Sequence, residues 1–221
     1  MSRQAENSSS SASVWSLLDR TKILPVVVLE DSDTAVPVAR ALAAGGVPLV
    51  EITLRTPAAA DAIRAIADSC SAVCVGAGTV LSAQDVDRAA DAGANFLVSP
   101  GLSEEIVAQA LERQVPLFPG VATATEIQAA QGLGFTHLKF FPAGPSGGPE
   151  ALRALKGPFP DVRFIPTGGV TRENAPDYLK TGNVLAVGGT WIVPGESVRR
   201  SDFGTIEELA GQAREHVRGS L

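Results

Sequence analysis

The stretch AVCVGAGTVLSAQDVDRAADAGANFLVSPG, residues 72–101, holds one complete strand–helix–strand unit. Its two ends are short apolar runs rich in valine and leucine, and each is followed or interrupted by glycine or proline. The segment between them is rich in alanine, with helical spacing of its apolar residues, Ser82 placed to cap the helix and Gly93 placed to end it. A strand and a helix that alternate in this way predict parallel strands joined by crossover helices.

The same unit recurs along the chain. Eight candidate strands recur every 20 to 26 residues: LPVVVLE from Leu24, PLVEITL from Pro48, AVCVGAG from Ala72, NFLVSPG from Asn95, VPLFPG from Val115, THLKFFPA from Thr136, VRFIPTGG from Val162 and VLAVGG from Val184. Eight such units predict a (β/α)8 TIM barrel, an α/β fold, in one domain over residues 14–221. A doubly wound sheet of six or seven strands is the alternative, although no GxGxxG opens the first helix.

The first thirteen residues differ from the rest. Residues 1–13 are polar and rich in serine, which predicts a disordered tail. They contain neither an apolar stretch nor a cleavage signal, so we do not expect a secretory peptide. No apolar run elsewhere approaches the ~20 residues that cross a bilayer. We therefore expect a cytoplasmic protein without a membrane partner.

Composition excludes several classes of partner. The chain has 221 residues, 45% of them hydrophobic, which suffices for one sizeable core, and its net charge of -6 offers no basic stripe to a nucleic acid. Two cysteines, Cys70 and Cys74, cannot build a disulfide framework or a four-ligand zinc site, and we expect both reduced. The two histidines, His137 and His216, lack metal-binding spacing, so we expect no metal site and a core role for His137.

In a TIM barrel the active site forms at the carboxyl ends of the strands. Those ends hold most of the unusual residues of this chain: Glu51–Arg55, Gly76–Thr79, Ser99–Gly101, Pro119–Gly120, Lys139–Ala143, Thr167–Gly169 and Gly188–Thr190.

Lys139 stands out among the four lysines because it lies inside the apolar run HLKFFP. An unpaired ammonium group buried there loses several kcal/mol of solvation, which favours the neutral amine that forms a Schiff base. Strand alternation turns Lys139 and Phe141 toward the barrel interior and Leu138 and Phe140 toward the helices. The alternatives are a lysine that extends to solvent and a buried ion pair.

A second strand carries Glu51, Thr53 and Arg55 on one face by the same alternation. Glu51 can serve as the general acid/base that imine chemistry requires, and Arg55 can hold a substrate carboxylate through two hydrogen bonds. A structural salt bridge between Glu51 and Arg55 inside the barrel is the rival interpretation.

Glycine-rich strand ends predict anion sites. PTGGV (Pro166–Val170) and VGGTW (Val187–Trp191) end the seventh and eighth strands, where such barrels usually bind phosphate through backbone N–H groups. The candidate phosphate-site residues are Thr167, Gly168, Gly169, Gly188, Gly189 and Thr190. Ser146–Gly148 is a possible third set of donors. GAGT (Gly76–Thr79) would bring the Thr79 hydroxyl to the carboxylate of a keto acid.

Together VEITLRT, GAGTV, SPG, LKFFPA, PTGGV and VGGTW resemble the 2-keto-3-deoxy-6-phosphogluconate (KDPG) aldolase family, which includes 4-hydroxy-2-oxoglutarate (KHG) aldolases. The resemblance spans about residues 14–217. It implies Lys139 as the Schiff-base lysine and Glu51 as the general acid/base. It also implies that Arg55 and Thr79 bind the pyruvyl carboxylate, and that Pro100 and Phe141 pack around the pyruvyl group.

The resemblance further implies that Gly168, Gly169 and Thr190 bind the substrate phosphate, that no cofactor is needed, and that the protein is a homotrimer. Many family members have serine at the position of Thr190. The expected reaction is cleavage of KDPG to pyruvate and glyceraldehyde 3-phosphate, with 4-hydroxy-2-oxoglutarate as a further substrate. The alternatives are an aldolase for the galactonate epimer, a phosphosugar isomerase or epimerase, and a catalytically silent binding module.

Overall fold

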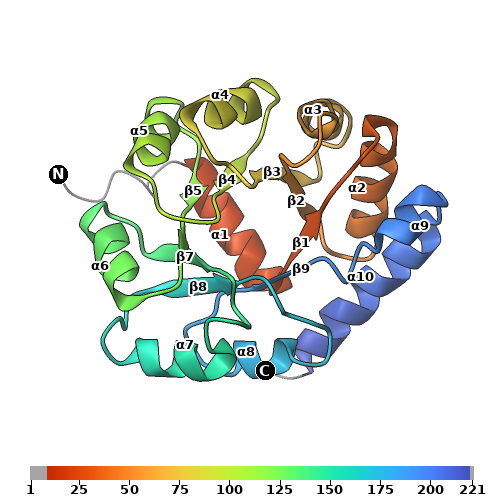
Figure 1. Cartoon of the computed structure of the whole chain (residues 1–221). Coiled ribbons are helices and arrows are strands. Elements are labelled where there is room, and N and C mark those ends of the chain that lie inside the picture. The colour runs from red at the N-terminus through yellow and green to blue at the C-terminus, as the bar shows by residue number, and fades with distance from the viewer. Residues whose placement is uncertain (1–8, 220–221) are drawn as a thin grey trace.

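The computed structural model describes residues 9–219, in which parallel strands alternate with helices (Figure 1). The strands are β1 (Ile23–Val27), β2 (Leu49–Thr53), β3 (Cys74–Gly78), β4 (Phe96–Val98), β5 (Leu117–Phe118), β6 (Gly120–Val121), β7 (His137–Phe140), β8 (Arg163–Pro166) and β9 (Val187–Gly189). Around them lie α1 (Ser9–Thr21), α2 (Ala35–Ala44), α3 (Ala59–Ser69), α4 (Ala83–Asp91), α5 (Glu104–Glu112), α6 (Ala124–Gly132), α7 (Gly148–Lys156), α8 (Ala175–Leu179), α9 (Gly195–Arg199) and α10 (Phe203–Arg218), with the short 3-10 helix η1 (Ser32–Thr34) before α2. The predicted alternation of strand and helix is confirmed.

The strands form two sheets, and this differs from the expected eight-stranded ring. A curled six-stranded sheet has the order β5-β4-β3-β2-β1-β9, and a three-stranded sheet has the order β6-β7-β8. Pro119 separates β5 from β6, and because proline has no N–H group it interrupts the ladder there. Between β8 and the residues preceding β9, one isolated bridge joins Phe164 to Val184. The sheet pairing therefore shows a parallel α/β fold and does not by itself show a closed barrel.

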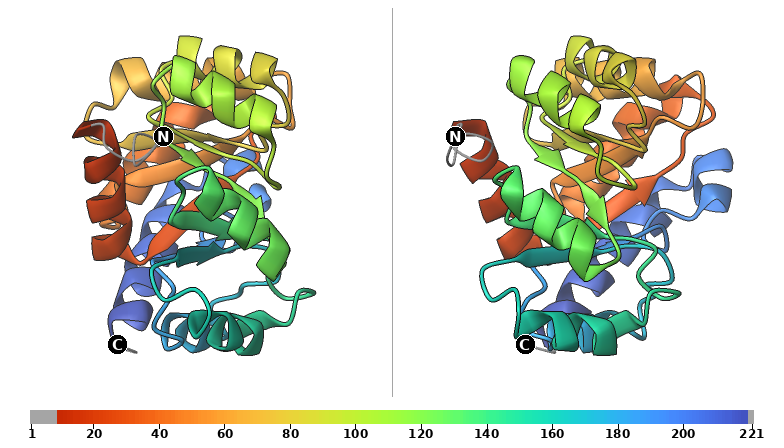
Figure 2. Two further views of the ribbon diagram at one scale, coloured as in Figure 1. Left: turned by 90° about the vertical axis from the view of Figure 1, so that its left-hand side faces the viewer. Right: turned by 60° about the vertical axis from the view of Figure 1, so that its left-hand side comes forward.

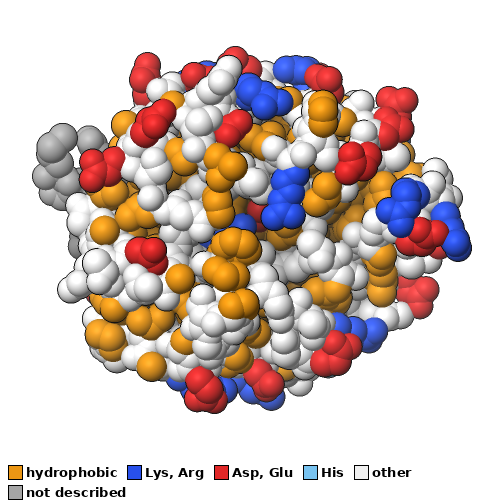
Figure 3. All heavy atoms as spheres, in the orientation of Figure 1, with side chains coloured by type: hydrophobic (Ala, Val, Ile, Leu, Met, Phe, Trp, Pro, Cys, Tyr) orange, Lys and Arg blue, Asp and Glu red, His pale blue; other side chains and the backbone are white. Residues whose placement is uncertain are grey.

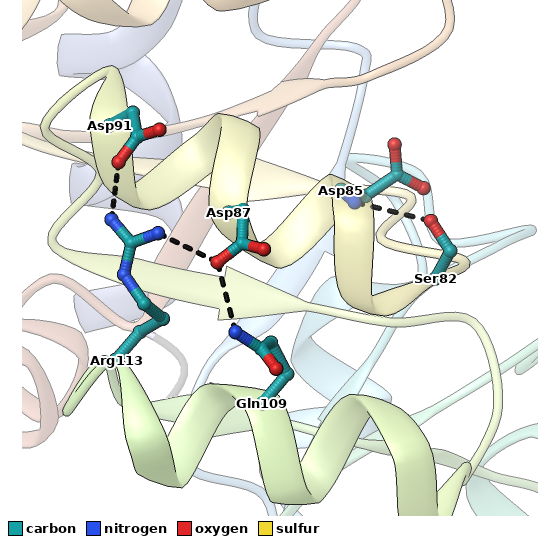
Figure 4. A network of polar contacts seen from close by, with 6 residues as sticks. All are labelled: Ser82, Asp85, Asp87, Asp91, Gln109 and Arg113. Carbon is teal, nitrogen blue, oxygen red and sulfur yellow. Dashed lines mark hydrogen bonds and ion pairs between the residues drawn. The ribbon is translucent and has the colours of Figure 1, made fainter.

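The unit over residues 72–101 folds as its pattern predicts. The Ser82 side chain accepts a hydrogen bond from the Asp85 N–H at 3.1 Å and caps α4. Gly93 follows α4 with a φ of +86°, a conformation that favours glycine. Figure 4 shows α4 tied to α5 by Arg113, which pairs with Asp87 at 2.6 Å and also with Asp91.

The amino-terminal helix α1 covers the end of the sheet at which the strands begin. The Trp15 indole stacks on the His137 ring, at the start of β7, with centroids 4.6 Å apart. It also meets the Phe118 ring edge-on at 4.3 Å. Figure 2 shows α1 along one side of the molecule, away from the side toward which the strands run. His137 is half-buried and packs on Trp15, so its contacts are structural, although it does not lie fully in the core as expected.

The disordered tail predicted for residues 1–13 is wrong in part. Residues 1–8 lie outside the described residues, but residues 9–13 belong to α1 rather than to a tail. Within residues 9–219, no helix is both long enough and apolar enough to span a membrane. Cys70 and Cys74 are free thiols, as expected, and burial raises the pKa of Cys74 to about 12, which leaves little reactive thiolate at neutral pH.

Candidate active site

A cavity of about 290 Å³ opens where the strands end. Its walls are Val26, Val28, Glu51, Thr53, Arg55, Thr79, Pro100, Lys139, Phe141, Thr167, Gly168, Gly169, Val170, Gly188, Gly189 and Thr190. The sequence predicted twelve of these as site residues, and all twelve line this one cavity. Figure 3 shows this face of the molecule hollowed near its middle, with acidic and basic side-chain atoms set back in the hollow.

A buried ion pair lies in the cavity wall. Lys139 Nζ of β7 and Glu51 Oε1 of β2 are 3.5 Å apart, and these side chains are 8% and 1% exposed. Glu51 therefore pairs with Lys139 and not with Arg55, so the expected rival, a Glu51–Arg55 salt bridge, does not form in this structure. Of the two alternatives for Lys139, extension to solvent is wrong, because the side chain is buried.

Strand alternation explains why these two groups meet. Leu138 and Phe140, on the opposite face of β7 from Lys139, are fully buried in the core, as is Ile52 beside Glu51. Gly120 pairs with Lys139 across the ladder, and a Cβ atom there would lie 2.2 Å from the carbonyl oxygen of Pro100, so the backbone packs closely beside Lys139. The predicted orientation of both strands is confirmed.

Glu51 has unusually few polar contacts for a buried carboxylate. Both of its oxygens are inaccessible to solvent, and neither accepts a hydrogen bond from the described residues. Most buried polar groups are hydrogen-bonded, and exceptions mark functional sites often enough to need an explanation. The amine of Lys139 is its one charged neighbour in the described part of the chain. A carboxylate and an amine held so close, out of water, are equipped to exchange protons.

Arg55 and Thr79 stand at the ends of β2 and β3. Arg55 is exposed at the cavity mouth and forms no ion pair with any residue between 9 and 219, so its guanidinium group is available to an anion. Thr79 has a φ of +58°, which a β-branched residue rarely adopts. Such strain is retained where the surrounding structure or function requires it, and Thr79 lines the cavity.

The two glycine pairs, Gly168–Gly169 after β8 and Gly188–Gly189 in β9, form a glycine wall of the same cavity. Gly168 and Gly169 have φ values of +90° and +84°, so this turn requires residues that tolerate the left-handed region. The Thr167 hydroxyl is buried and has no hydrogen-bond partner among residues 9–219, and a Cβ on Gly188 would lie 2.2 Å from it. Ser146, Gly147 and Gly148, considered as further anion donors, do not line the cavity.

Four cavity residues were not among the predicted site residues: Val26, Val28, Thr53 and Val170. Strand alternation in the sequence could have identified three of them. Val26 and Val28 alternate along the first strand run, and Thr53 shares a face with Glu51 and Arg55. Strand alternation applied to the first strand would have found the two valines. Among residues 9–219, no group of three or more His, Cys, Asp or Glu side chains lies together so as to hold a metal ion.

Comparison with known proteins follows the same residues. The family described as KDPG and KHG aldolase matches residues 14–209. The chain belongs to this family. It is 46% identical over 204 residues to the 2-dehydro-3-deoxy-phosphogluconate aldolase of Pseudomonas aeruginosa, covering 92% of this chain and 93% of that protein. It is 45% identical over 203 residues to the KHG/KDPG aldolase of Escherichia coli, with 92% and 95% covered.

A solved structure of the family is similar throughout the fold. The KDPG aldolase of Legionella pneumophila, with pyruvate captured as a covalent carbinolamine intermediate, has a TM-score of 0.87 and 38% identity, covering 90% of this chain and 97% of that one. Membership of the KDPG and KHG aldolase family makes the chain a lyase, and it agrees with the imine chemistry inferred from Lys139.

Proposed function

We propose that this protein is a class I aldolase that cleaves KDPG to pyruvate and glyceraldehyde 3-phosphate through a Schiff base on Lys139. The observation that carries the proposal is the buried pair of Lys139 and Glu51, 3.5 Å apart, in the wall of the cavity. The names of the relatives from Pseudomonas aeruginosa and Escherichia coli support the substrate, and the covalent pyruvate in the Legionella protein supports the mechanism.

In the proposed reaction, the neutral amine of Lys139 attacks the C2 carbonyl and forms a carbinolamine. Glu51 donates the proton with which the hydroxyl leaves as water, and an iminium ion results. The iminium accepts the electron pair of the C3–C4 bond as the C4 hydroxyl passes its proton to the Glu51 carboxylate, which releases the aldehyde and leaves an enamine. A proton returned to C3 and addition of water then release pyruvate and the free amine.

We assign the substrate carboxylate to Arg55 and Thr79, with Pro100 and Phe141 packing around the pyruvyl portion. Arg55 is free of ion pairs in residues 9–219, and the Phe141 ring centroid lies 5.1 Å from Lys139 Nζ, next to the reacting carbon. This assignment supplies a positive charge at the mouth of a cavity in a protein whose net charge is -6.

We assign the phosphate to the glycine wall, through Gly168, Gly169 and Thr190, with Thr167, Gly188 and Gly189 completing the wall. The positive φ values of Gly168 and Gly169 expose backbone there without a side chain in the way. Thr190 keeps the hydroxyl that family members usually carry on serine, with one extra methyl group in the loop.

A second substrate, 4-hydroxy-2-oxoglutarate, has specific support because the Escherichia coli relative is named for both activities. This substrate has no phosphate but shares the pyruvyl half, so Lys139, Glu51 and Arg55 would act on it unchanged. The galactonate epimer remains the alternative within the family. A phosphosugar isomerase or a catalytically silent binding module would have no use for the buried pair of Lys139 and Glu51, so the pair favours the aldolase over both.

One assay tests the function directly. We expect pyruvate release from KDPG, more slowly from 4-hydroxy-2-oxoglutarate, and at unchanged rate with EDTA present. Faster release from the galactonate-derived epimer would reassign the substrate. No release from any of the three, with the protein folded, would end the aldolase proposal.

We also propose that the two sheets are arcs of one closed (β/α)8 barrel, with β5 and β6 forming one strand interrupted at Pro119. Backbone hydrogen bonds at both seams support this: Lys139 N–H to Pro119 O at 2.9 Å, and Leu185 N–H to Phe164 O at 2.9 Å. Protection of these two amides from hydrogen exchange, equal to that of the β2 amides, is the expected result. Rapid exchange at either one would show an open seam.

From the family resemblance we propose a homotrimer, and we place the protein in the cytoplasm, where its free thiols would remain reduced. Light scattering of the purified protein should give three times the chain mass of 22.8 kDa. A monomeric or dimeric mass would contradict the trimer without affecting the chemistry.

A further inference from the structure

The interior face of β3 carries two glycines, Gly76 and Gly78, which alternate with the fully buried Val75 and Ala77. A Cβ atom added to Gly78 would lie 2.0 Å from Glu51 Oε1 and 2.6 Å from Glu51 Cδ. Real Cβ atoms essentially never approach another atom within 3.0 Å. The Glu51 carboxylate therefore occupies the space that any side chain at position 78 would need.

Little else in the described structure fixes this carboxylate. Neither oxygen accepts a hydrogen bond from residues 9–219, and the 3.5 Å separation from Lys139 Nζ exceeds the usual length of a charged hydrogen bond. Since hydrogen bonds do not orient the group, the shape of its surroundings does. The bare backbone of Gly78 is one wall of that surrounding space, directly against the carboxylate.

We infer that Gly78 is a positioning residue for Glu51: its missing side chain leaves the slot in which the carboxylate lies beside Lys139. The inference rests on the proposed role of Glu51 as proton shuttle. That role requires one carboxylate to serve three atoms in turn: the hydroxyl oxygen of the carbinolamine, the C4 hydroxyl oxygen of the substrate and the C3 carbon of the enamine. A slot walled by glycine, with no hydrogen bonds to break, allows the carboxylate to turn between them.

Gly76 provides a matched control on the same face of the same strand. A Cβ atom there would lie 2.3 Å from the Phe96 ring, and the three atoms nearest to it all belong to that ring rather than to Glu51, its ladder partner on β2. Alanine at position 76 therefore crowds the core below the site, whereas alanine at position 78 crowds the site itself. The two substitutions add the same methyl group two residues apart, so their difference isolates the effect on Glu51.

The first experiment compares Gly78→Ala with Gly76→Ala. For Gly78→Ala we expect kcat to fall by roughly 10²-fold, the lower end of the range for loss of a general acid/base, with KM changed by less than about threefold. Exchange of the pyruvate methyl protons in heavy water should slow in parallel, while borohydride still traps pyruvate on Lys139. Gly76→Ala should lower the melting temperature and keep its turnover per folded molecule.

The second experiment asks whether the effect passes through Glu51. Glu51→Asp shortens the side chain by one methylene and withdraws the carboxylate from the added methyl group. The Glu51→Asp/Gly78→Ala variant should therefore lose less activity than the product of the two single losses. If Gly78→Ala does not fold, Glu51→Ala/Gly78→Ala should fold, because the side chain that meets the methyl group is gone.

Several outcomes would overturn the inference. They are normal turnover of Gly78→Ala, losses of the single variants that simply multiply, and a Glu51→Ala/Gly78→Ala variant that fails to fold when Gly78→Ala fails. Each of these requires an active wild-type protein, so they are distinct from failure of the proposed function, in which the wild type itself would release no pyruvate and trap none.

Discussion

The two ends of the strand interior contain different kinds of side chain, although His137 and Lys139, which represent them on β7, lie only two positions apart. At the beginning of the strand, His137 stacks on Trp15, which in turn meets Phe118, and Phe118 meets Phe96 edge-on at 5.8 Å. At the other end, Lys139 has only the Glu51 carboxylate as a charged partner among the described residues. One end is filled with stacked rings and closed by α1, and the other holds charges around a cavity.

This difference shows that the residues that stabilise the fold and the residues that react lie at different ends of the same strands. Aromatic packing at the end where the strands begin gains from buried area and from edge-to-face geometry. At the carboxyl ends of the strands, Lys139 and Glu51 lie without full hydrogen bonding. This lowers the stability of the fold but provides reactive groups. Substitutions near the carboxyl ends of the strands should therefore reduce activity at constant stability. Substitutions where the strands begin should reduce stability at constant activity.

Lys139→Met should have the largest effect, because methionine fills a similar volume without an amine. We expect no pyruvate release above the buffer rate and no adduct after borohydride reduction with pyruvate, as measured by mass spectrometry. The control is Lys22→Met, which removes the lysine paired with Asp19 before β1 and should leave both signals intact. An adduct on Lys22, or activity of Lys139→Met, would end the Schiff-base assignment.

Glu51→Gln keeps the side-chain volume but cannot transfer a proton at neutral pH. We expect kcat to fall by about 10²–10⁴-fold, with pyruvate still bound and proton exchange into pyruvate slowed in parallel by NMR. Were Glu51 only the ion-pair partner of Lys139, the melting temperature would drop and turnover per folded molecule would survive.

Trp15→Ala is the corresponding change at the end where the strands begin. Removing the half-buried indole from between His137 and Phe118 should cost roughly 3 kcal/mol of unfolding free energy, measured by urea denaturation. Turnover per folded molecule should stay close to that of the wild type, because Trp15 packs where the strands begin and Lys139 lies where they end. Trp15→Phe should restore most of the stability. A loss of kcat in folded Trp15→Ala would mean that the two ends are coupled.

Arg55→Met should weaken the binding of every keto acid, phosphorylated or not, because all share the carboxylate. Loss of a charged hydrogen bond of this kind costs about 1.5–3 kcal/mol, which appears as a rise in KM. Arg55→Lys should recover only part of the affinity, since lysine cannot form the two-pronged contact. A defect confined to phosphorylated substrates would show that the two ends of the substrate are exchanged.

Thr79→Gly should have the smallest and most mixed effect. Relief of roughly 1–3 kcal/mol of strain at the positive φ should exceed the roughly 0.4–1 kcal/mol of added entropy in the unfolded chain. We expect a slightly higher melting temperature together with a severalfold higher KM for keto acids. Thr79→Ser should keep the wild-type KM, and a lower melting temperature for Thr79→Gly would show that φ +58° is not strained.

Local pattern was sufficient for much of this protein. Alternation along two strands placed Lys139 and Glu51 on the interior faces, since side chains on a strand change sides at every residue. Ser82 and Gly93 marked the two ends of α4, because capping and left-handed turns depend on neighbouring residues alone. All twelve predicted site residues lie at strand ends, which parallel strands bring to one edge, whereas the assignment of Pro100 to the pyruvyl group came from the family resemblance.

Only the tertiary structure decided which of these groups are partners. Strand alternation turned both Arg55 and Lys139 toward the same interior as Glu51, so either could have been its partner. In the folded chain Glu51 pairs with Lys139 across the interior and not with Arg55 on its own strand. The Trp15–His137 stack and the slot over Gly78 join residues more than 25 positions apart in sequence. Periodicity describes the surroundings of one segment, whereas these contacts depend on how separate segments pack.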